Sequence, residues 1–218
     1  MIIELRQYTC VGGRREDLIS LFEEHFLDGY EAAGVRVEGT FRDLDDADRW
    51  VWIRGFDKVT DRRPGYEGFY ASGVWKRHAD ACNATIKESA NSLLLKKGAG
   101  DWVANDGIVS VALHSVPDPN AFARLFEKHL RPILEDLGAH PVTFLSTDPA
   151  APDEQPLRDD PVFAWFAQWP DEVAEAEFRA RWASASGWRD GIRQPALSLL
   201  RRKPEWLRLS PTSRSRPR

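Results

Sequence analysis

Two short segments near the start of the chain place polar and aromatic residues on one face of a strand. Both Ile2–Tyr8 and Trp50–Phe56 alternate between two faces, as β-strands do. The face of interest carries Glu4, Arg6, Tyr8, Trp50, Trp52, Arg54 and Phe56. Arginines can hold an anionic or enolate oxygen, indole rings can sandwich a planar ring, and a phenol can transfer a proton. This residue set predicts a pocket for a planar, polar-edged small molecule.

Within that pocket we expect Tyr8 and Arg54 to be catalytic, and Glu4, Arg6, Trp50, Trp52 and Phe56 to bind the substrate. The alternative is that Glu4 and the arginines form a satisfied internal ion network that fixes strand register.

His78 is the third candidate catalytic residue. It is followed by Asp80 and Asn83 in the segment after FYASGVWKR, and Asn83 is expected to bind substrate. A histidine with an ordinary pKa near 6.5 suits proton transfer near neutral pH. The alternative is a solvated helix end without a catalytic role.

His25 and His129 recur in two similar Glu-x-His motifs. A two-residue spacing places Glu and His on different helix faces, so the motif is not a metal-ligand pair. Packing or a hydrogen bond to a loop is expected, and a general base or a haem ligand is the alternative. A Soret band would reveal haem bound through His25, His78 or His114. Otherwise no cofactor and no metal are expected.

The composition excludes several classes of protein. The 218 residues carry a formal charge of −4 and an isoelectric point near 5.8, which does not fit a nucleic-acid-binding domain. No apolar run is long enough to span a membrane. The chain starts directly with a strand pattern, so we expect a cytoplasmic protein. Cys10 and Cys82 have no metal or redox spacing and are expected to be reduced.

The sequence also repeats itself. LFEEHF at 21–26 returns as LFEKHL at 125–130, an offset of 104 residues. An offset of 113 relates Trp52 to Trp165 and Trp75 to Trp188, and the insertion TDPAAPDEQPLRDDP accounts for the increase. These matches predict a duplicated chain.

Each half is predicted to run strand, helix, strand, strand, helix, strand. In the first half we expect strands at 2–8, 35–42, 50–56 and 92–97, and helices at 14–33 and 58–84, the second one interrupted at Pro64-Gly65. In the second half we expect strands at 108–116, 142–147, 162–169 and 196–202, and helices at 120–137 and 171–185. The predicted domains are therefore 1–97 and 108–203, with a linker at 98–107 and a basic, disordered tail at 204–218.

This order is that of the ferredoxin-like motif, so the predicted fold class is α+β: two tandem ferredoxin-like repeats. Helices cover one face of such a sheet, and the other face needs a partner. Two sheets can supply it to each other as a barrel inside one chain. We expect the aliphatic residues Ile3, Leu5, Val51 and Ile53 to lie under the helices, and the polar face to line the barrel interior. Ser110, Ala112, His114 and Ala167 replace the charged residues in the second half, so one working pocket is expected.

Several of these segments resemble the NIPSNAP family. The resemblance rests on ELRQY near the start, the helix ending before Gly34, WVWIRGF, and FYASGVWKRH with the region of Asn83. It covers most of residues 1–97 and, more weakly, 107–203. It implies the dimeric α+β barrel superfamily, whose members include cofactor-free monooxygenases, haem enzymes, isomerases and stress-response binders.

By analogy with that superfamily, the expected function is a bacterial, cofactor-independent enzyme of secondary metabolism: an oxygenase, isomerase or dehydratase acting on a small aromatic or polycyclic metabolite. The alternative is a non-catalytic metabolite-binding or protein-interaction module. The expected partner is a small-molecule ligand, with neither nucleic acid nor membrane, and a homodimer is a further expectation.

Overall fold

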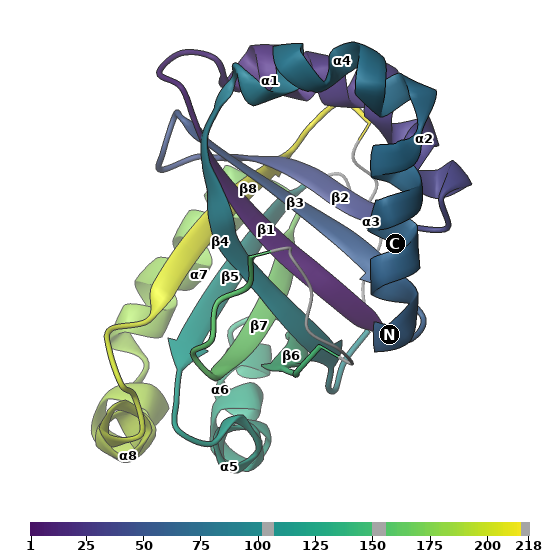
Figure 1. Ribbon diagram of the computed structural model, residues 1–218. Helices are drawn as coiled ribbons and strands as arrows, with labels where there is room; N and C mark the ends of the chain where they lie inside the picture. The colour runs from purple at the N-terminus through teal and green to yellow at the C-terminus, as the bar shows by residue number, and fades with distance from the viewer. Residues whose placement is uncertain (102–106, 150–155, 215–218) are drawn as a thin grey trace. The chain divides into compact units, whose positions relative to one another are not determined.

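The computed structural model describes residues 1–101, 107–149 and 156–214. These residues form two compact units. Unit 1 comprises 1–96 together with 147–158 and the C-terminal residues from 210, and unit 2 comprises 97–146 and 159–209. Each unit has one antiparallel sheet and its own helices (Figure 1).

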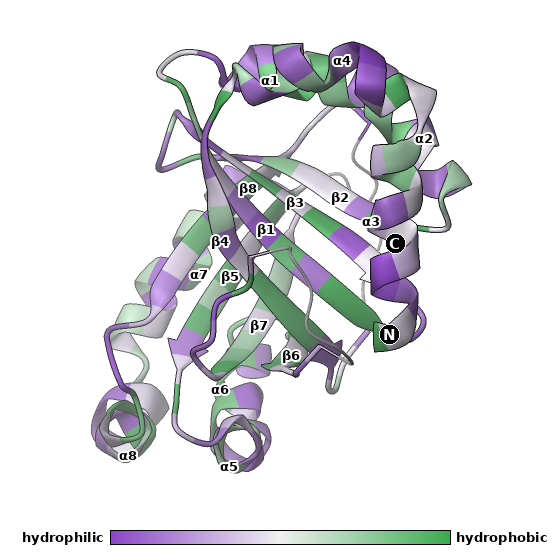
Figure 2. Cartoon of the chain, viewed as in Figure 1, coloured by the Kyte–Doolittle hydropathy of each residue, from purple (hydrophilic) through white to green (hydrophobic). Residues whose placement is uncertain are grey.

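Unit 1 is built from a four-stranded sheet with the strand order β4-β1-β3-β2. Its strands are β1 (Ile2–Cys10), β2 (Arg36–Asp43), β3 (Arg49–Phe56) and β4 (Ile86–Lys97). Its helices are α1 (Arg15–Leu21), α2 (Leu27–Ala32), α3 (Arg62–Ala71) and α4 (Gly73–Asn83). The hydropathy of β1 and β3 alternates along each strand, as the sequence pattern predicts (Figure 2).

The first helix of unit 1 is continuous from α1 to α2, because the π-helical turn Phe22–Phe26 joins them. Gly34 ends it with a φ of +78°, a conformation that favours glycine. The prediction of a helix over 14–33 is therefore confirmed. π-Helical turns inside helices are frequent at functional sites.

The second helical region differs from the prediction. Helix α3 runs through Pro64-Gly65, because Pro64 lies in the first turn, where its missing N–H is not needed. The break falls at Ser72 instead, which has an extended backbone. Its hydroxyl accepts a hydrogen bond from the Trp75 amide at 3.2 Å and so caps α4.

Unit 2 has the strand order β6-β7-β5-β8. Its strands are β5 (Ile108–Ser115), β6 (Val142–Ser146), β7 (Val162–Trp169) and β8 (Glu205–Pro211). Its helices are α5 (Pro119–Leu125), α6 (Arg131–Asp136), α7 (Glu172–Ser184) and α8 (Arg193–Ser198), with π-helical turns at Phe126–Leu130 and Gly187–Ile192.

The end of the chain corrects the sequence analysis. The segment 196–202, predicted to be a strand, begins inside helix α8. The last strand is β8, within the segment predicted to be a disordered tail. Leu207 and Leu209 are buried on β8, and this alternation of Trp206-Leu207-Arg208-Leu209 is the strand signal. Residues 215–218 of the predicted tail, and 102–106 of the predicted linker, lie outside the described residues.

Within each unit, every strand pair described above is antiparallel. The α+β prediction and the order of elements in each half hold; the descent of both halves from one ferredoxin-like repeat stays a prediction. At the edge of β2, within unit 1, the Thr212 amide donates to the Thr40 carbonyl at 2.9 Å, and the two threonine hydroxyls lie 2.5 Å apart.

In the described part of the chain, no helix is both long and apolar enough to cross a membrane. Cys10 and Cys82 are free and buried, in agreement with the prediction that they are reduced.

Candidate functional site

The polar face of β1 and β3 points toward the helices of unit 1, and the prediction that it faces the other way was wrong. The rings of Trp50 and Trp52 lie 4.8 and 5.1 Å from the ring of Phe22, on the first helix. The aliphatic residues of the opposite face, such as Leu5 and Val51, are also fully buried. Alternation determines which residues share a face, but it does not determine which face the helices cover.

Strand register brings the predicted residues together. In the β1–β3 pair, Glu4 lies opposite Arg54, Arg6 opposite Trp52, and Tyr8 opposite Trp50. Residues directly opposite in an antiparallel pair have neighbouring side chains. Two strands distant in sequence therefore assemble one continuous polar and aromatic face.

Glu4 is the centre of a buried ion cluster. Its Oε2 accepts hydrogen bonds from Arg6 Nη1 at 3.0 Å and from Arg54 Nε at 2.6 Å. Its Oε1 accepts from Arg62 Nε, on helix α3. None of these four side chains is more than 2% exposed. The carboxylate thus joins both strands to a helix.

Within the described residues, the charges of Arg6, Arg54 and Glu4 do not cancel, because the two guanidinium groups share one carboxylate. Arg62 also pairs with that carboxylate. Burial raises the pKa of Glu4, but attraction to Arg54, Arg6 and Arg62 outweighs it and lowers the pKa to about 2. Burial lowers the pKa of Arg6, while Tyr8 and Glu4 raise it more, so Arg6 stays charged. Within the described residues, both Nη atoms of Arg54 are buried without a hydrogen-bond partner.

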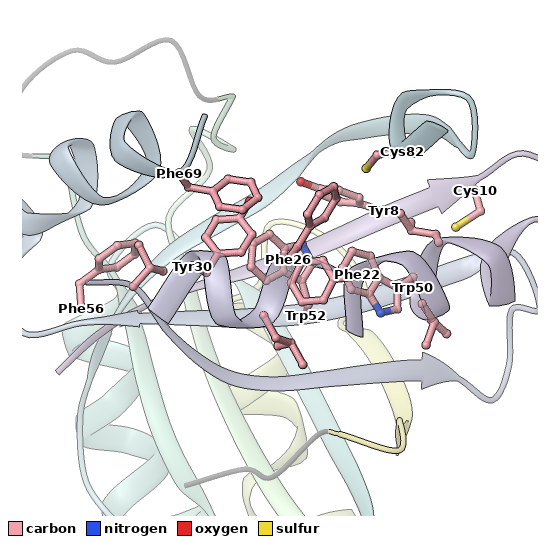
Figure 3. Packing of buried hydrophobic residues seen from close by; sticks show 14 of the residues in the cluster. Tyr8, Cys10, Phe22, Phe26, Tyr30, Trp50, Trp52, Phe56, Phe69 and Cys82 are labelled. Atoms are coloured by element: carbon pink, nitrogen blue, oxygen red, sulfur yellow. The ribbon is translucent and has the colours of Figure 1, made fainter. Parts of the chain in front are cut away.

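A cavity of about 350 Å³ opens beside this cluster, between the sheet and the helices of unit 1. Such a volume fits a small-molecule site. Most of its wall is aromatic, and Figure 3 shows these rings gathered between the strands and the first helix. The lining residues are Arg6, Tyr8, Leu18, Phe22, Phe26, Tyr30, Trp50, Trp52, Tyr70, Trp75, Cys82, Asn83, Ile86, Ser89 and Pro156.

Five of the predicted site residues line this cavity: Arg6, Tyr8, Trp50, Trp52 and Asn83. The Tyr8 hydroxyl accepts a hydrogen bond from Arg6 Nε at 3.2 Å, which leaves its own proton available to a ligand. Trp50 and Trp52 do not sandwich a ring between them. They are stacked in one row at 5.7 Å, with Tyr8 edge-on to both.

The other four predicted residues do not line it. Glu4 and Arg54 lie behind Arg6 as the ion cluster, and Phe56 is buried with Arg54 5.9 Å from its ring. His78 is stacked on His25, with the ring centres 3.9 Å apart and the planes at 13°. The structural role expected for His25 therefore involves His78, the residue expected to be catalytic.

Several residues of the site were not predicted from the sequence. Arg62 was overlooked because it precedes Pro64-Gly65, where an interruption was expected. Tyr30 and Tyr70, on α2 and α3, add two phenols to the cavity wall. Burial raises the pKa of both. The sequence signal for Tyr30 is helical spacing, since Leu18, Phe22, Phe26 and Tyr30 recur every four residues on one helix face.

The second half carries a different set of buried polar residues. Ser110, which replaces Glu4, accepts a hydrogen bond from Trp169 Nε1 at 3.0 Å. Unit 2 also contains a buried carboxylate, that of Glu175 on helix α7, which pairs with Arg208 at 2.9 Å and with Arg179 at 3.1 Å. The predicted absence of charge at Ala112 and Ala167 holds, and both are buried.

In the described residues, no three His, Cys, Asp or Glu side chains converge as a metal site. No protein-family model and no curated protein matches the sequence.

Solved structures similar to this chain fall into two groups. One includes a "putative monooxygenase" from Lactobacillus acidophilus, with 12% identity, a TM-score of 0.60, and coverage of 96% of this chain and 93% of that one. It also includes an anthrone oxidase-like protein, with 12% identity, a TM-score of 0.63, and coverage of 98% and 92%. The other includes a NIPSNAP domain protein from Burkholderia xenovorans, with 17% identity and a TM-score of 0.43, covering 47% of this chain and all of that one.

NIPSNAP proteins are among the structural neighbours. Over nearly its whole length, the chain has the fold of the Lactobacillus acidophilus and anthrone oxidase-like proteins.

Proposed function

We propose that unit 1 binds a small aromatic or polycyclic metabolite and converts it without a cofactor. The single observation that carries this proposal is the position of Arg6. It belongs to a buried cluster with more guanidinium groups than carboxylates, and it lines an aromatic cavity beside the Tyr8 hydroxyl. A cation in such surroundings stabilises an anionic oxygen far better than it would in water.

The proposed chemistry begins with a substrate that releases a proton to solvent water and becomes a phenolate or enolate. Arg6 holds the resulting oxygen anion, Trp50 and Trp52 pack along the ring, and Tyr8 donates a hydrogen bond or returns the proton. Arg54 and Glu4 keep Arg6 in place. Asn83 contacts the substrate at the cavity wall.

Three reaction types share this first step: oxygenation, isomerisation and dehydration. The anthrone oxidase-like neighbour favours the first. An electron-rich enolate can reduce dioxygen directly, and CH₂ + O₂ → C=O + H₂O balances without another reductant. Dioxygen is then the co-substrate.

A non-catalytic metabolite binder is the second candidate, and one observation favours it. Among the described residues, the cavity wall holds no histidine and no carboxylate, so none of the described lining residues is a general base with a pKa near neutrality. His78 faces His25 instead.

The test uses 4-nitrophenol, whose ionised form absorbs at longer wavelength than its neutral form. We expect the pKa of the bound phenol to fall below that of the free phenol, because Arg6 stabilises the phenolate. Arg6→Met should abolish this shift. In Arg6→Met, Glu4 remains paired with Arg54 and Arg62, so the variant should still fold. Circular dichroism checks its folding. Arg42→Met, which removes a cation paired with Glu16 outside the cavity wall, is the matched control.

An unchanged shift in Arg6→Met would overturn the proposed binding mode. Catalysis is tested separately, with anthrone under air, by measuring oxygen consumption and formation of the quinone. Turnover that is lost in Tyr8→Phe supports the enzyme. A normal phenol shift without any turnover favours the binder.

A further inference from the structure

Unit 2 contains a second cavity, of about 410 Å³, between its own sheet and helices. It occupies the place that corresponds to the first cavity, since Trp165, Trp188 and Phe126 stand where Trp52, Trp75 and Phe22 stand in unit 1. The chemistry of its wall differs. Ala112 takes the place of Arg6, and His114 that of Tyr8.

Four tryptophans make this cavity a site for a planar apolar body. Trp182 and Trp188 are stacked at 4.7 Å, and Trp206 meets Trp165 edge-on at 5.5 Å. Trp206 is 38% exposed, an unusual position for so large an apolar side chain. Aromatic rings held at such distances offer flat faces on which a ligand ring can stack.

His114 provides a polar point inside this apolar wall. Its ring stacks on Phe122 at 5.1 Å, and both ring nitrogens are buried without a hydrogen-bond partner in the described residues. Burial lowers its pKa to about 4, so the ring is neutral near pH 7. A neutral imidazole has one donor and one acceptor, and leaving both unpaired is costly. A ligand hydroxyl or carbonyl group would satisfy one of them.

Two cations also line the cavity, and both are exposed. Arg193 is on helix α8 and Lys203 precedes β8. Neither takes part in an ion pair within the described residues. Unlike Arg6, these cations remain in contact with water, so they can attract a charged group at the entrance without a desolvation cost.

From these four features we propose that unit 2 holds a second ligand site, for an aromatic carboxylic acid. The ring lies among the tryptophans, a polar ring substituent meets His114, and the carboxylate reaches Arg193 and Lys203. The two units would then select different ligands. Unit 1 selects a ligand whose oxygen anion is buried against Arg6. Unit 2 selects a ligand whose carboxylate lies at the cavity entrance, near Arg193 and Lys203.

The test compares 2-naphthoate with its neutral analogue 2-naphthalenemethanol by calorimetry on the full chain. We expect naphthoate to bind more tightly. Arg193→Glu with Lys203→Glu should weaken naphthoate binding about tenfold, since each exposed charge contributes a fraction of that effect, and should leave the alcohol unaffected. Arg124→Glu with Lys128→Glu is the matched control, because it makes the same charge change at exposed residues of unit 2 outside the cavity wall.

Ring ¹⁵N signals of histidine identify the site independently of charge. With the signals of His114 assigned through His114→Gln, either ligand should shift them, and should do so equally in Arg6→Met. The proposal is overturned if naphthoate binds the charge-reversed variant as tightly as the original protein. It is also overturned if the signals of His25 and His78 move while those of His114 stay. Because unit 1 could also bind naphthoate through Arg6, the calorimetry is done in the Arg6→Met background, so that neither result depends on what unit 1 binds.

Discussion

Replacing Glu4 by Gln should destabilise the protein strongly, because it removes the carboxylate with which Arg6, Arg54 and Arg62 all pair. The depressed pKa sets the magnitude. A fall from 4.5 to about 2 corresponds to on the order of 3 kcal/mol of stability. Breaking a buried ion pair by removing one partner costs about 3–5 kcal/mol, which agrees. We therefore expect Glu4→Gln to lower the free energy of unfolding by about 3 kcal/mol near pH 7.

The effect should depend on pH with a definite sign. Glu4 has a lower pKa in the folded protein than in the unfolded chain, so its stabilisation is complete above about pH 4.5 and is lost as the pH falls toward about 2. The difference between the original protein and Glu4→Gln should narrow over that window.

Urea unfolding followed by tryptophan fluorescence measures both effects. Glu16→Gln is the control, because Glu16 is 55% exposed and pairs with Arg42 at 2.6 Å. An exposed pair contributes less than about 1 kcal/mol. Equal losses in the two variants would refute the reasoning, and so would a Glu4→Gln deficit that stays constant as the pH is lowered.

Two further outcomes follow from the packing of unit 1. Gly65→Ala should destabilise the protein by about 1 kcal/mol or more, because a Cβ there would lie 2.6 Å from Val35 Cγ2. Gly68→Ala on the same helix should stabilise it by up to about 1 kcal/mol, because the new Cβ would meet only Ala33, at 3.6 Å. Thermal unfolding that ranks the two variants the other way contradicts this reasoning. Burial raises the pKa of Cys10 to about 11 and that of Cys82 to about 12. Iodoacetamide at about pH 8 should therefore label both thiols only after urea is added. Rapid labelling of the native protein would show instead that the thiols are accessible.

Sequence patterns predicted the members of the candidate site better than its location. Alternation correctly grouped Glu4, Arg6 and Tyr8 with Trp50 and Trp52. It gave the wrong side of the sheet because both faces of these strands are buried. Polarity then cannot identify the helix-covered face, and the choice rested on the assumption that aliphatic residues pack under helices.

The other errors have local physical causes. Pro64 was taken as an interruption, although in a first turn proline costs a helix nothing. The catalytic role of His78 stays a prediction; its position away from the cavity wall could not be predicted, because side-chain stacking between helices, here with His25, has no sequence signal. Strand β8 was missed because Lys203-Pro204 and the arginines beyond it suggested a solvated tail. The alternation of Trp206, Leu207, Arg208 and Leu209 spans only four residues.

The pairing of Thr212 with Thr40 has a consequence for biosynthesis. Their sequence separation is 172 residues, and Arg214 continues the contact by binding Asp28 at 3.1 Å. Everything else in unit 1 has left the ribosome before this segment is made. The edge of β2 near Thr40 therefore lacks this hydrogen-bond partner while the whole second unit is being translated. Synthesis order thus means that unit 1 cannot be complete before Thr212 and Arg214 have been made.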